Sequence, residues 1–178
     1  MNKRQKSFHL IADAVLAFLC ILLDQYTKKL AVMHLKDQPA KILINKVFCL
    51  YYLENRGAAF GMFQNRQVIF LIVSVVFCLA LIYMLIKVPI NKRFYLAEAV
   101  FVLLFAGAIG NMIDRVSNGF VVDFFYFELI DFPVFNVADI YVTVSCFALM
   151  ILILFVYKEE DIDSFKIASF GKKSNEKI

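Results

Sequence analysis

The feature that most constrains this chain is an apolar run at residues 68–88, VIFLIVSVVFCLALIYMLIKV, which carries no charge before Lys87. An α-helix rises about 1.5 Å per residue, so about 20 such residues cross the roughly 30 Å hydrocarbon core of a bilayer. Three other stretches have a similar character, and the four predicted spans are residues 8–30, 68–88, 94–113 and 138–157. We expect them to form one domain over residues 1–157, followed by a charged cytoplasmic tail at 158–178.

The composition agrees with a membrane-embedded chain. Of its 178 residues, 62% are hydrophobic and 19% are charged, whereas soluble domains are about half apolar and a quarter charged. The net charge of +4 is small, and no basic stripe with interleaved aromatic residues indicates nucleic-acid binding. The four cysteines and two histidines lack the spacing of metal ligands, so we expect neither a metal nor another cofactor.

The N-terminus, MNKRQK, is basic and precedes an apolar run, as in a secretory signal peptide. The run lacks a small-residue cleavage site, and Asp24 follows it, so we interpret it as a retained first helix. Under the positive-inside rule the basic end stays in the cytoplasm, and four spans return the C-terminus to the same side. We therefore expect a multi-pass membrane protein whose termini are both cytoplasmic.

Two segments between the spans do not fit a simple helix. Residues 42–53, ILINKVFCLYYL, are rich in β-branched and aromatic residues and lie between turn signals, which predicts a small β-element outside the cytoplasm. Residues 116–137 are apolar but are interrupted by Gly119 and Pro133, which favours a partly embedded connection packed against protein. The predicted fold is an α-helical membrane protein of four transmembrane helices, with a small extracytoplasmic β-sheet and this connection between spans three and four.

Polar side chains are expensive inside a membrane, so their positions are informative. With this topology most of them gather near the outer edge of the bilayer, whereas Asp13 and Glu98 lie one turn inside the opposite edge, from which we expect them to reach water. The outer group also has structural interpretations, such as an i,i+4 pair between Asp24 and Lys28 or helix capping by asparagine. Its members are Asp24, Lys28, Asn55, Asn111, Asp114, Arg115, Asp123, Asn136 and Asp139.

Within this group, Asp123 and Asp139 are each embedded in apolar sequence, FVVDFFYF and FNVADIYV, with no cation within four residues. Two carboxylates brought together in a poorly solvated place share a proton, because both cannot ionise cheaply. The ionised partner then takes a proton from water while the protonated one polarises an amide carbonyl. This chemistry predicts hydrolysis of a peptide bond at the membrane surface without a metal ion.

At these residues the sequence resembles the lipoprotein signal peptidases of bacteria (type II signal peptidases), in the order and spacing of that family and over nearly all of the chain up to Tyr157. The resemblance implies an aspartic endopeptidase in which Asp123 and Asp139 are the catalytic residues. It further implies that Asp24, Lys28, Asn55, Gly57, Asn111, Arg115 and Asn136 shape the site or contact the substrate. The matching stretches are LDQYTK at 23–28, ENRGAAFGMF at 54–63, FAGAIGNMIDRV at 105–116, VVDF at 121–124 and FNVAD at 135–139.

The resemblance also implies a substrate and a location. The family removes the signal peptide from prolipoproteins, cutting just before a cysteine that already carries a diacylglyceryl group, in the bacterial cytoplasmic (inner) membrane with the site towards the outer leaflet. We expect membrane lipids and globomycin-type cyclic peptide inhibitors to bind, and the protein to be a monomer. A small outer sheet and a mobile flap, both implied by the resemblance, agree with residues 42–53 and 54–63, and we expect Asn55 and the Gly-Ala-Ala stretch after Arg56 to form part of a lid.

One departure from the family pattern is Ile140, since a small or hydroxyl residue commonly follows the second aspartate; it puts the packing around Asp139 in question. We also expect small residues to let an apolar signal segment lie close between the helices; these are Gly107, Gly110, Gly57, Ala58 and Ala59. Two other functions stay open from the residues alone: a small ion- or proton-coupled transporter, and a non-catalytic scaffold that captures lipoproteins or lipids. The lack of a visible repeat and the position of the acids at one edge favour the peptidase.

Overall fold

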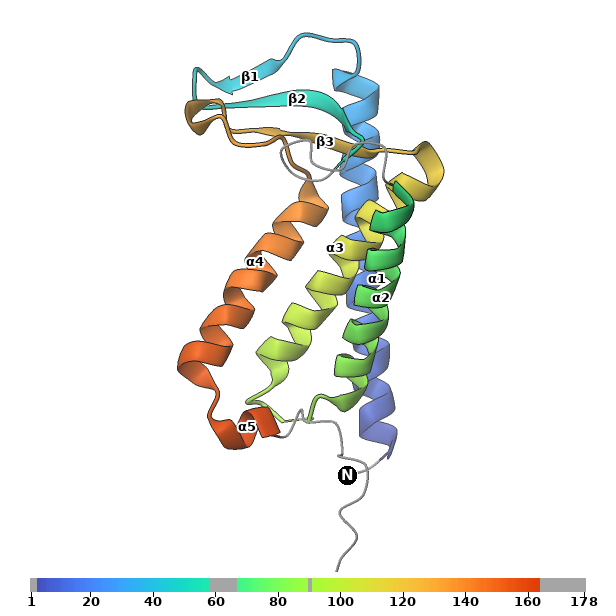
Figure 1. Cartoon of the computed structure of the whole chain (residues 1–178), viewed down its shortest axis with the longest axis vertical. Coiled ribbons are helices and arrows are strands. Elements are labelled where there is room, and N and C mark those ends of the chain that lie inside the picture. The colour runs from blue at the N-terminus through green and yellow to red at the C-terminus, as the bar shows by residue number, and fades with distance from the viewer. Residues whose placement is uncertain (1–2, 58–66, 90, 164–178) are drawn as a thin grey trace, which may run out of the picture.

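The computed structural model describes residues 3–57, 67–89 and 91–163, and its helices form an elongated bundle capped at one end by a small sheet (Figure 1). The four long helices are α1 (Lys3–Leu35), α2 (Gln67–Lys87), α3 (Tyr95–Asn118) and α4 (Val137–Ile151), the last continued by a π-helical turn, η3 (Leu152–Val156). Within the described ranges, four helices are long and apolar enough to cross a membrane. The predicted class, four apolar helices with a small sheet, is confirmed.

The first helix is longer than the predicted span of 8–30, because the amphipathic stretch DQYTKKLAVMHL continues it to Leu35. At about 1.5 Å per residue its 33 residues extend roughly 50 Å, well beyond a bilayer core. Its last turns pack against the sheet, where Ala31 and Leu35 form an apolar cluster with Val122 and Phe124. One helix therefore connects the membrane bundle to the sheet.

Helix α3 is the centre of the bundle. Half of the residues in its most apolar stretch are buried inside the protein, compared with 11–17% for the other three spans. Two glycines allow its neighbours to approach. A Cβ atom on Gly107 would lie 2.7 Å from the carbonyl oxygen of Ala138, and one on Gly110 would lie 2.5 Å from Oδ2 of Asp24. The expectation that these glycines make room for a substrate segment is therefore wrong, because α4 and α1 already occupy that space.

The sheet consists of β1 (Lys41–Ile44), β2 (Phe48–Asn55) and β3 (Val121–Tyr126), antiparallel and in that order. It lies across one end of the helices (Figure 1). The first two strands come from the segment predicted to be β-rich, whereas β3 belongs to the connection at 116–137, where no strand was expected. Gly119 closes α3 in the left-handed region, at φ 79°, and turns the chain directly into β3.

The opposite end of the bundle holds a second set of polar groups. Nζ of Lys6 donates to the carbonyl oxygens of Leu85 (3.1 Å) and Val88 (2.9 Å), at the end of α2. Glu98 is only 6% exposed and faces Nδ1 of His9 at 3.4 Å. The expectation that Glu98 reaches water is wrong, because α1 packs over the first turn of α3 and covers the carboxylate.

A short last helix, α5 (Glu159–Asp163), is the only part of the predicted tail that the structure describes as helical. Its Asp161 forms a bidentate pair with Arg93, with distances of 2.7 Å from Nε and 2.6 Å from the second guanidinium nitrogen. This pair joins the chain after η3 to the turn between α2 and α3.

Candidate active site

The site is organised around the first residues of α4. Asn136 is the N-cap of that helix, with extended backbone angles, and its side-chain oxygen accepts from the backbone N–H of Asp139 at 3.0 Å. In return Oδ2 of Asp139 accepts from the backbone N–H of Asn136 at 3.1 Å. This reciprocal capping box fixes the Asp139 carboxylate at the helix N-terminus, where the peptide dipoles favour a negative charge.

Asp123 comes from β3 and meets the same asparagine. Its Oδ1 accepts from Nδ2 of Asn136 at 2.6 Å, and its Oδ2 accepts from Nδ2 of Asn55, on β2, at 2.9 Å. The side chain is 1% exposed, so these two amides replace water as its hydrogen-bond donors. Asn136 therefore links the two carboxylates, one through its side chain and the other through its backbone.

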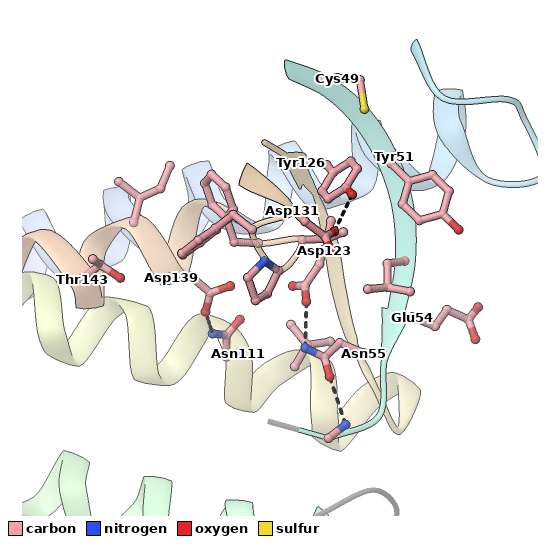
Figure 2. A pocket seen from close by; sticks show the side chains of 18 of the residues that line it. Cys49, Tyr51, Glu54, Asn55, Asn111, Asp123, Tyr126, Asp131, Asp139 and Thr143 are labelled. Atoms are coloured by element: carbon pink, nitrogen blue, oxygen red, sulfur yellow. Dashed lines mark hydrogen bonds between the residues drawn. The ribbon is translucent and has the colours of Figure 1, made fainter. Parts of the chain in front are cut away.

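Asn111, on α3, completes the group of asparagines. Its Nδ2 donates to Oδ1 of Asp139 at 2.8 Å, while its own oxygen accepts from Asn136 at 3.2 Å and from Nζ of Lys28 at 2.9 Å. In Figure 2 the side chains of Asn111 and Asn55 approach Asp139 and Asp123 from two different elements. All four carboxylate oxygens thus accept hydrogen bonds from neutral amides, which leave each carboxylate free to exchange a proton.

Beneath the asparagines, Lys28 is the cation of a buried cluster. Its Nζ lies 2.9 Å from Asp24, as the i,i+4 interpretation predicts, and 3.1 Å from Asp114. Each of these carboxylates also holds a backbone amide beside the aspartate pair. Asp24 accepts from the N–H of Ala138 at 2.9 Å, and Asp114 accepts from the N–H of Val122 at 3.0 Å. One ammonium group therefore ties together the two segments that carry Asp139 and Asp123.

Two residues of this cluster were missed as site residues in the sequence. In the sequence Asp114 belongs to the outer polar group without a predicted role in the site, and Gln25 is not among the predicted site residues. Nε2 of Gln25 donates to Asp24 (3.1 Å), to the carbonyl of Gly110 (3.1 Å) and to Asp114 (3.0 Å). The available signal was position: Gln25 follows Asp24, and Asp114 lies one helical turn after Asn111.

The remaining predicted site residues lie beside the pair. The Arg115 guanidinium stands 5.1 Å from the ring centre of Phe70 and donates to the carbonyl of Asn111 at 3.3 Å. The backbone N–H of Gly57 donates to Oδ1 of Asn55 at 3.0 Å, which orients that amide towards Asp123. The rest of the predicted lid, residues 58–63, lies outside the described residues.

Asp123 and Asp139 both line one cavity of about 1220 Å³, between the sheet and the start of α4 (Figure 2). Its sheet side is mixed, with the polar groups of Tyr126, Glu128 and Asp131 beside apolar residues such as Ile42 and Leu53. Its helix side is largely apolar and includes Val142 and Val144. Ile140, the departure from the family pattern, also lines the cavity and is 38% exposed, so it is not forced into the packing behind Asp139.

The electrostatics of Asp123 follow from this placement. Burial, and then the nearby charge of Asp139, raise the pKa of Asp123 from its ordinary 3.8 to about 7, although the amides of Asn55 and Asn136 and the charge of Lys28 act in the opposite direction. Near neutral pH this carboxyl is therefore poised to hold or release a proton. Among the described residues, no group of three or more His, Cys, Asp or Glu side chains is placed to hold a metal ion.

Comparisons with known proteins agree over most of the chain. The sequence profile of the family described as signal peptidase (SPase) II matches residues 16–155. The lipoprotein signal peptidase of Caldanaerobacter subterraneus is 44% identical over 82% of this chain and 97% of its own length. That of Clostridioides difficile is 43% identical over 79% and 93%, respectively.

Solved structures give the same result. Two structures, each described as a bacterial membrane enzyme and determined at 2.3 Å and 1.9 Å resolution, align with TM-scores of 0.72 and 0.70 at 30% identity. They cover 83% and 82% of this chain, and 92% and 94% of their own chains. The chain is thus a multi-pass bacterial membrane peptidase that belongs to the signal peptidase II family.

Proposed function

We propose that Asp123 and Asp139 form the catalytic pair of this peptidase. The observation that carries the proposal is Asn136, which donates to Asp123 through its side chain at 2.6 Å and to Asp139 through its backbone at 3.1 Å, on the wall of one cavity. The donors around Asp139 and its position at the N-terminus of α4 favour a negative charge there. Asp123, with a pKa of about 7, is the partner that carries the shared proton.

The reaction then follows from the two protonation states. A water molecule lying between the carboxylates gives a proton to Asp139 as its oxygen attacks the scissile carbonyl carbon. Asp123 donates its proton to the carbonyl oxygen, which stabilises the tetrahedral intermediate. Collapse of the intermediate breaks the C–N bond; the hydroxyl proton returns to Asp123, and Asp139 gives its proton to the leaving amine. The resting state of the pair is restored without a covalent intermediate.

The substrate we propose is a prolipoprotein whose cysteine carries a diacylglyceryl group, cut just before that cysteine. The relatives named lipoprotein signal peptidase support this choice. The lining of the cavity does as well, because its apolar wall at Ile140, Val142 and Val144 suits acyl chains or an apolar signal segment, while the polar groups of Tyr126, Glu128 and Asp131 on the sheet side suit the peptide. We also propose that membrane lipids and globomycin-type cyclic peptides bind here, and that a monomer is sufficient.

For the topology we propose that residues 1–157 form the peptidase domain, with both termini and the tail at 158–178 in the cytoplasm and the aspartate pair towards the outer leaflet. The basic N-terminus supports this orientation through the positive-inside rule. We further propose that Asn55 and Gly57, which line the cavity, form the fixed edge of a lid. Cross-linking the Gly-Ala-Ala stretch after Arg56 to the end of α3 should abolish cleavage, and unchanged turnover would count against the lid.

The experiment that tests the proposed function compares two forms of one precursor in liposomes containing the purified protein. One form carries the diacylglyceryl group on its lipobox cysteine and the other is unmodified. We expect the lipidated form to be cut to a product that begins with the modified cysteine, as read by mass spectrometry. Equal cleavage of both forms, or cleavage at another bond, would refute the proposed substrate.

A further inference from the structure

One end of the sheet carries a small apolar surface that the peptidase chemistry does not use. It consists of Ile44, Leu129 and Ile130, with 58%, 68% and 68% of their surface exposed; we name it the sheet tip. Its two parts are neighbours, because the N–H of Leu129 donates to the carbonyl of Val47 at 3.4 Å, and Val47 itself closes a turn onto Ile44 at 3.0 Å. Large aliphatic side chains exposed together on a turn usually mark a surface that contacts something else.

The turn that presents Leu129 and Ile130 is amphipathic. It is the 3₁₀ helix η2 (Glu128–Ile130), followed by Asp131 in the left-handed region. Glu128 and Asp131, three residues apart, both line the cavity, and Asp131 accepts from the hydroxyl of Tyr126 at 2.7 Å. The two aliphatic residues between them do not line it. The acids therefore face the cavity, and the aliphatic side chains face away from it.

Aromatic packing supports this end of the sheet. The rings of Phe48 and Phe127 lie 4.8 Å apart, those of Phe127 and Phe135 lie 5.7 Å apart, and Phe132 packs edge-on against Phe135 at 5.8 Å. These contacts join β2, the turn after β3 and the residue before the cap of α4. The three aliphatic residues of the sheet tip therefore lie next to a packed cluster of phenylalanine rings.

The surface next to the sheet tip is the side of α4. The turn between β1 and β2 and the segment after β3 reach sideways past the start of α4 (Figure 1). Below them α4 exposes Val144 and Phe147, which belong to a span long and apolar enough to lie in a membrane. Phe132 and Ile140, which are 46% and 38% exposed, both line the cavity, so exposed apolar side chains lie at this end of the sheet, at the cavity and along α4.

We propose that the sheet tip inserts into the lipid leaflet that surrounds this end of the bundle. Lipid is the occupant that continues from the exposed side of α4, and two exposed lysines of the same hairpin, Lys41 and Lys46, suit anionic headgroups. The chain has no tryptophan for the interface, and the phenylalanine cluster with its aliphatic tip takes that place. Insertion brings the mouth of the cavity to the level of the lipid glycerol. The inference does not depend on the proposed substrate or on the identity of the catalytic pair.

The absence of tryptophan from the sequence provides a direct test. Ile44→Trp, Leu129→Trp and Ile130→Trp are made separately, so that a folding failure of one leaves the others, and each is placed in vesicles of phosphatidylcholine and phosphatidylglycerol. The matched control is Gln38→Trp, at an exposed position in the turn after α1. That turn lies above the sheet in Figure 1, on the side away from α2, α3 and α4. Each variant then contains a single tryptophan.

We expect tip variants to emit at shorter wavelength than the control, to lose emission with lipids brominated near the glycerol, and to resist quenching by iodide in water. The control should show the reverse. Tip tryptophans that behave like Gln38→Trp would overturn the proposal, because the tip would then lie in water. A blue shift that depends on the protein-to-lipid ratio, without quenching by brominated lipid, would overturn it in favour of contact with a second protein molecule.

Discussion

The two ends of the bundle both hold ionisable side chains, but they satisfy them differently. At the sheet end, every carboxylate oxygen of Asp123 and Asp139 accepts a hydrogen bond. At the other end, Asp13 and Glu98 lie against each other, Nδ1 of His9 lies 3.4 Å from Oε1 of Glu98, and among the described residues no amide donates to Oδ2 of Asp13 or Oε1 of Glu98. Both ends bury acids, and only one surrounds them with fixed amide donors.

The difference indicates what the proposed catalytic pair requires in a low-dielectric setting. Amide donors hold carboxylates in place without neutralising them, whereas a direct cation would keep both ionised. In this protein the cation, Lys28, is placed one layer away, on Asp24 and Asp114. The kind of donor that surrounds each buried acid is therefore a better indicator of proton exchange than the position of the acid in the bundle.

The largest expected effect comes from replacing the two aspartates themselves. Asp123→Asn and Asp139→Asn should each lower kcat by about 10²–10⁴-fold, because each removes a proton acceptor or donor from the reaction. Glu98→Gln, which changes a buried acid at the other end, should retain most of the wild-type turnover. Cleavage of a lipidated precursor gives kcat, and circular dichroism checks folding. Normal turnover by a folded Asp123 or Asp139 variant would remove that residue from the mechanism.

The second prediction compares the lysines of the two ends. Lys28→Met should lower the free energy of unfolding by about 3–5 kcal/mol, because it leaves two buried carboxylates without their cation. Lys6→Met should cost about 1–2 kcal/mol, since it removes hydrogen bonds to two backbone carbonyls at a partly buried position. Chemical denaturation in detergent measures both. Equal decreases in the free energy of unfolding would show that the contacts of Lys28 stabilise the protein no more than those of Lys6.

The third prediction tests the close approach that supports the site. Gly110→Ala should lower the free energy of unfolding by about 1–3 kcal/mol, because the added Cβ atom overlaps Oδ2 of Asp24. It should also reduce kcat, since Asp24 holds the amide of Ala138. Val116→Ala, at an exposed position on the same helix, is the control and should change neither quantity measurably. A variant as stable and active as the wild type would indicate that α1 and α3 separate without cost.

The fourth prediction concerns pH. The pKa of Asp123 is about 7, compared with an ordinary value of 3.8. Between these values the folded protein retains a proton that the unfolded chain has lost, so the free energy of unfolding should fall as pH rises from about 4 to about 7, and then level off. Asp123→Asn should lack this component, which denaturation across that pH range would measure. In the wild type, kcat/KM should fall above about pH 7 as Asp123 loses its proton.

The smallest effect is expected at the ion pair between Arg93 and Asp161, at the end of the bundle opposite the sheet. Arg93→Ala should lower the thermal unfolding temperature less than any variant above except Val116→Ala and leave kcat unchanged, because water screens the pair between Arg93 and Asp161. Differential scanning fluorimetry in detergent measures the shift. A large loss of activity would instead make the contact between α5 and the turn before α3 part of what positions α4.

The four spans and two of the three strands could be predicted from local sequence, because each is marked by a long apolar run or a run of β-branched and aromatic residues. The third strand could not, because VVDFFY is a short apolar run that fits an embedded connection as well as it fits a strand. It forms a strand because β2 is available to pair with it, with Leu53 opposite Asp123. Strand pairing across 70 residues of sequence leaves no local signal.

The aspartate pair itself could be predicted because an acid in apolar sequence requires a reason. The arrangement around the pair could not. Gln25 and Asp114 lie on different helices and meet only because Gly110 lets α1 approach α3. Glu98 was expected to reach water, and the packing of α1 over α3 buries it instead.

The sequence by itself determined that this chain spans a membrane several times, and which acids, amides and cations it brings to one edge, because hydrophobicity and the cost of burying charge act on each segment separately. Only the tertiary structure decided which amide meets which carboxylate: Asn136 between the two aspartates, Lys28 on Asp24 and Asp114, and Glu98 beneath α1. The physical reason is that hydrogen bonds and ion pairs act over about 3 Å, and such distances are fixed by the packing of helices and strands that are remote in sequence.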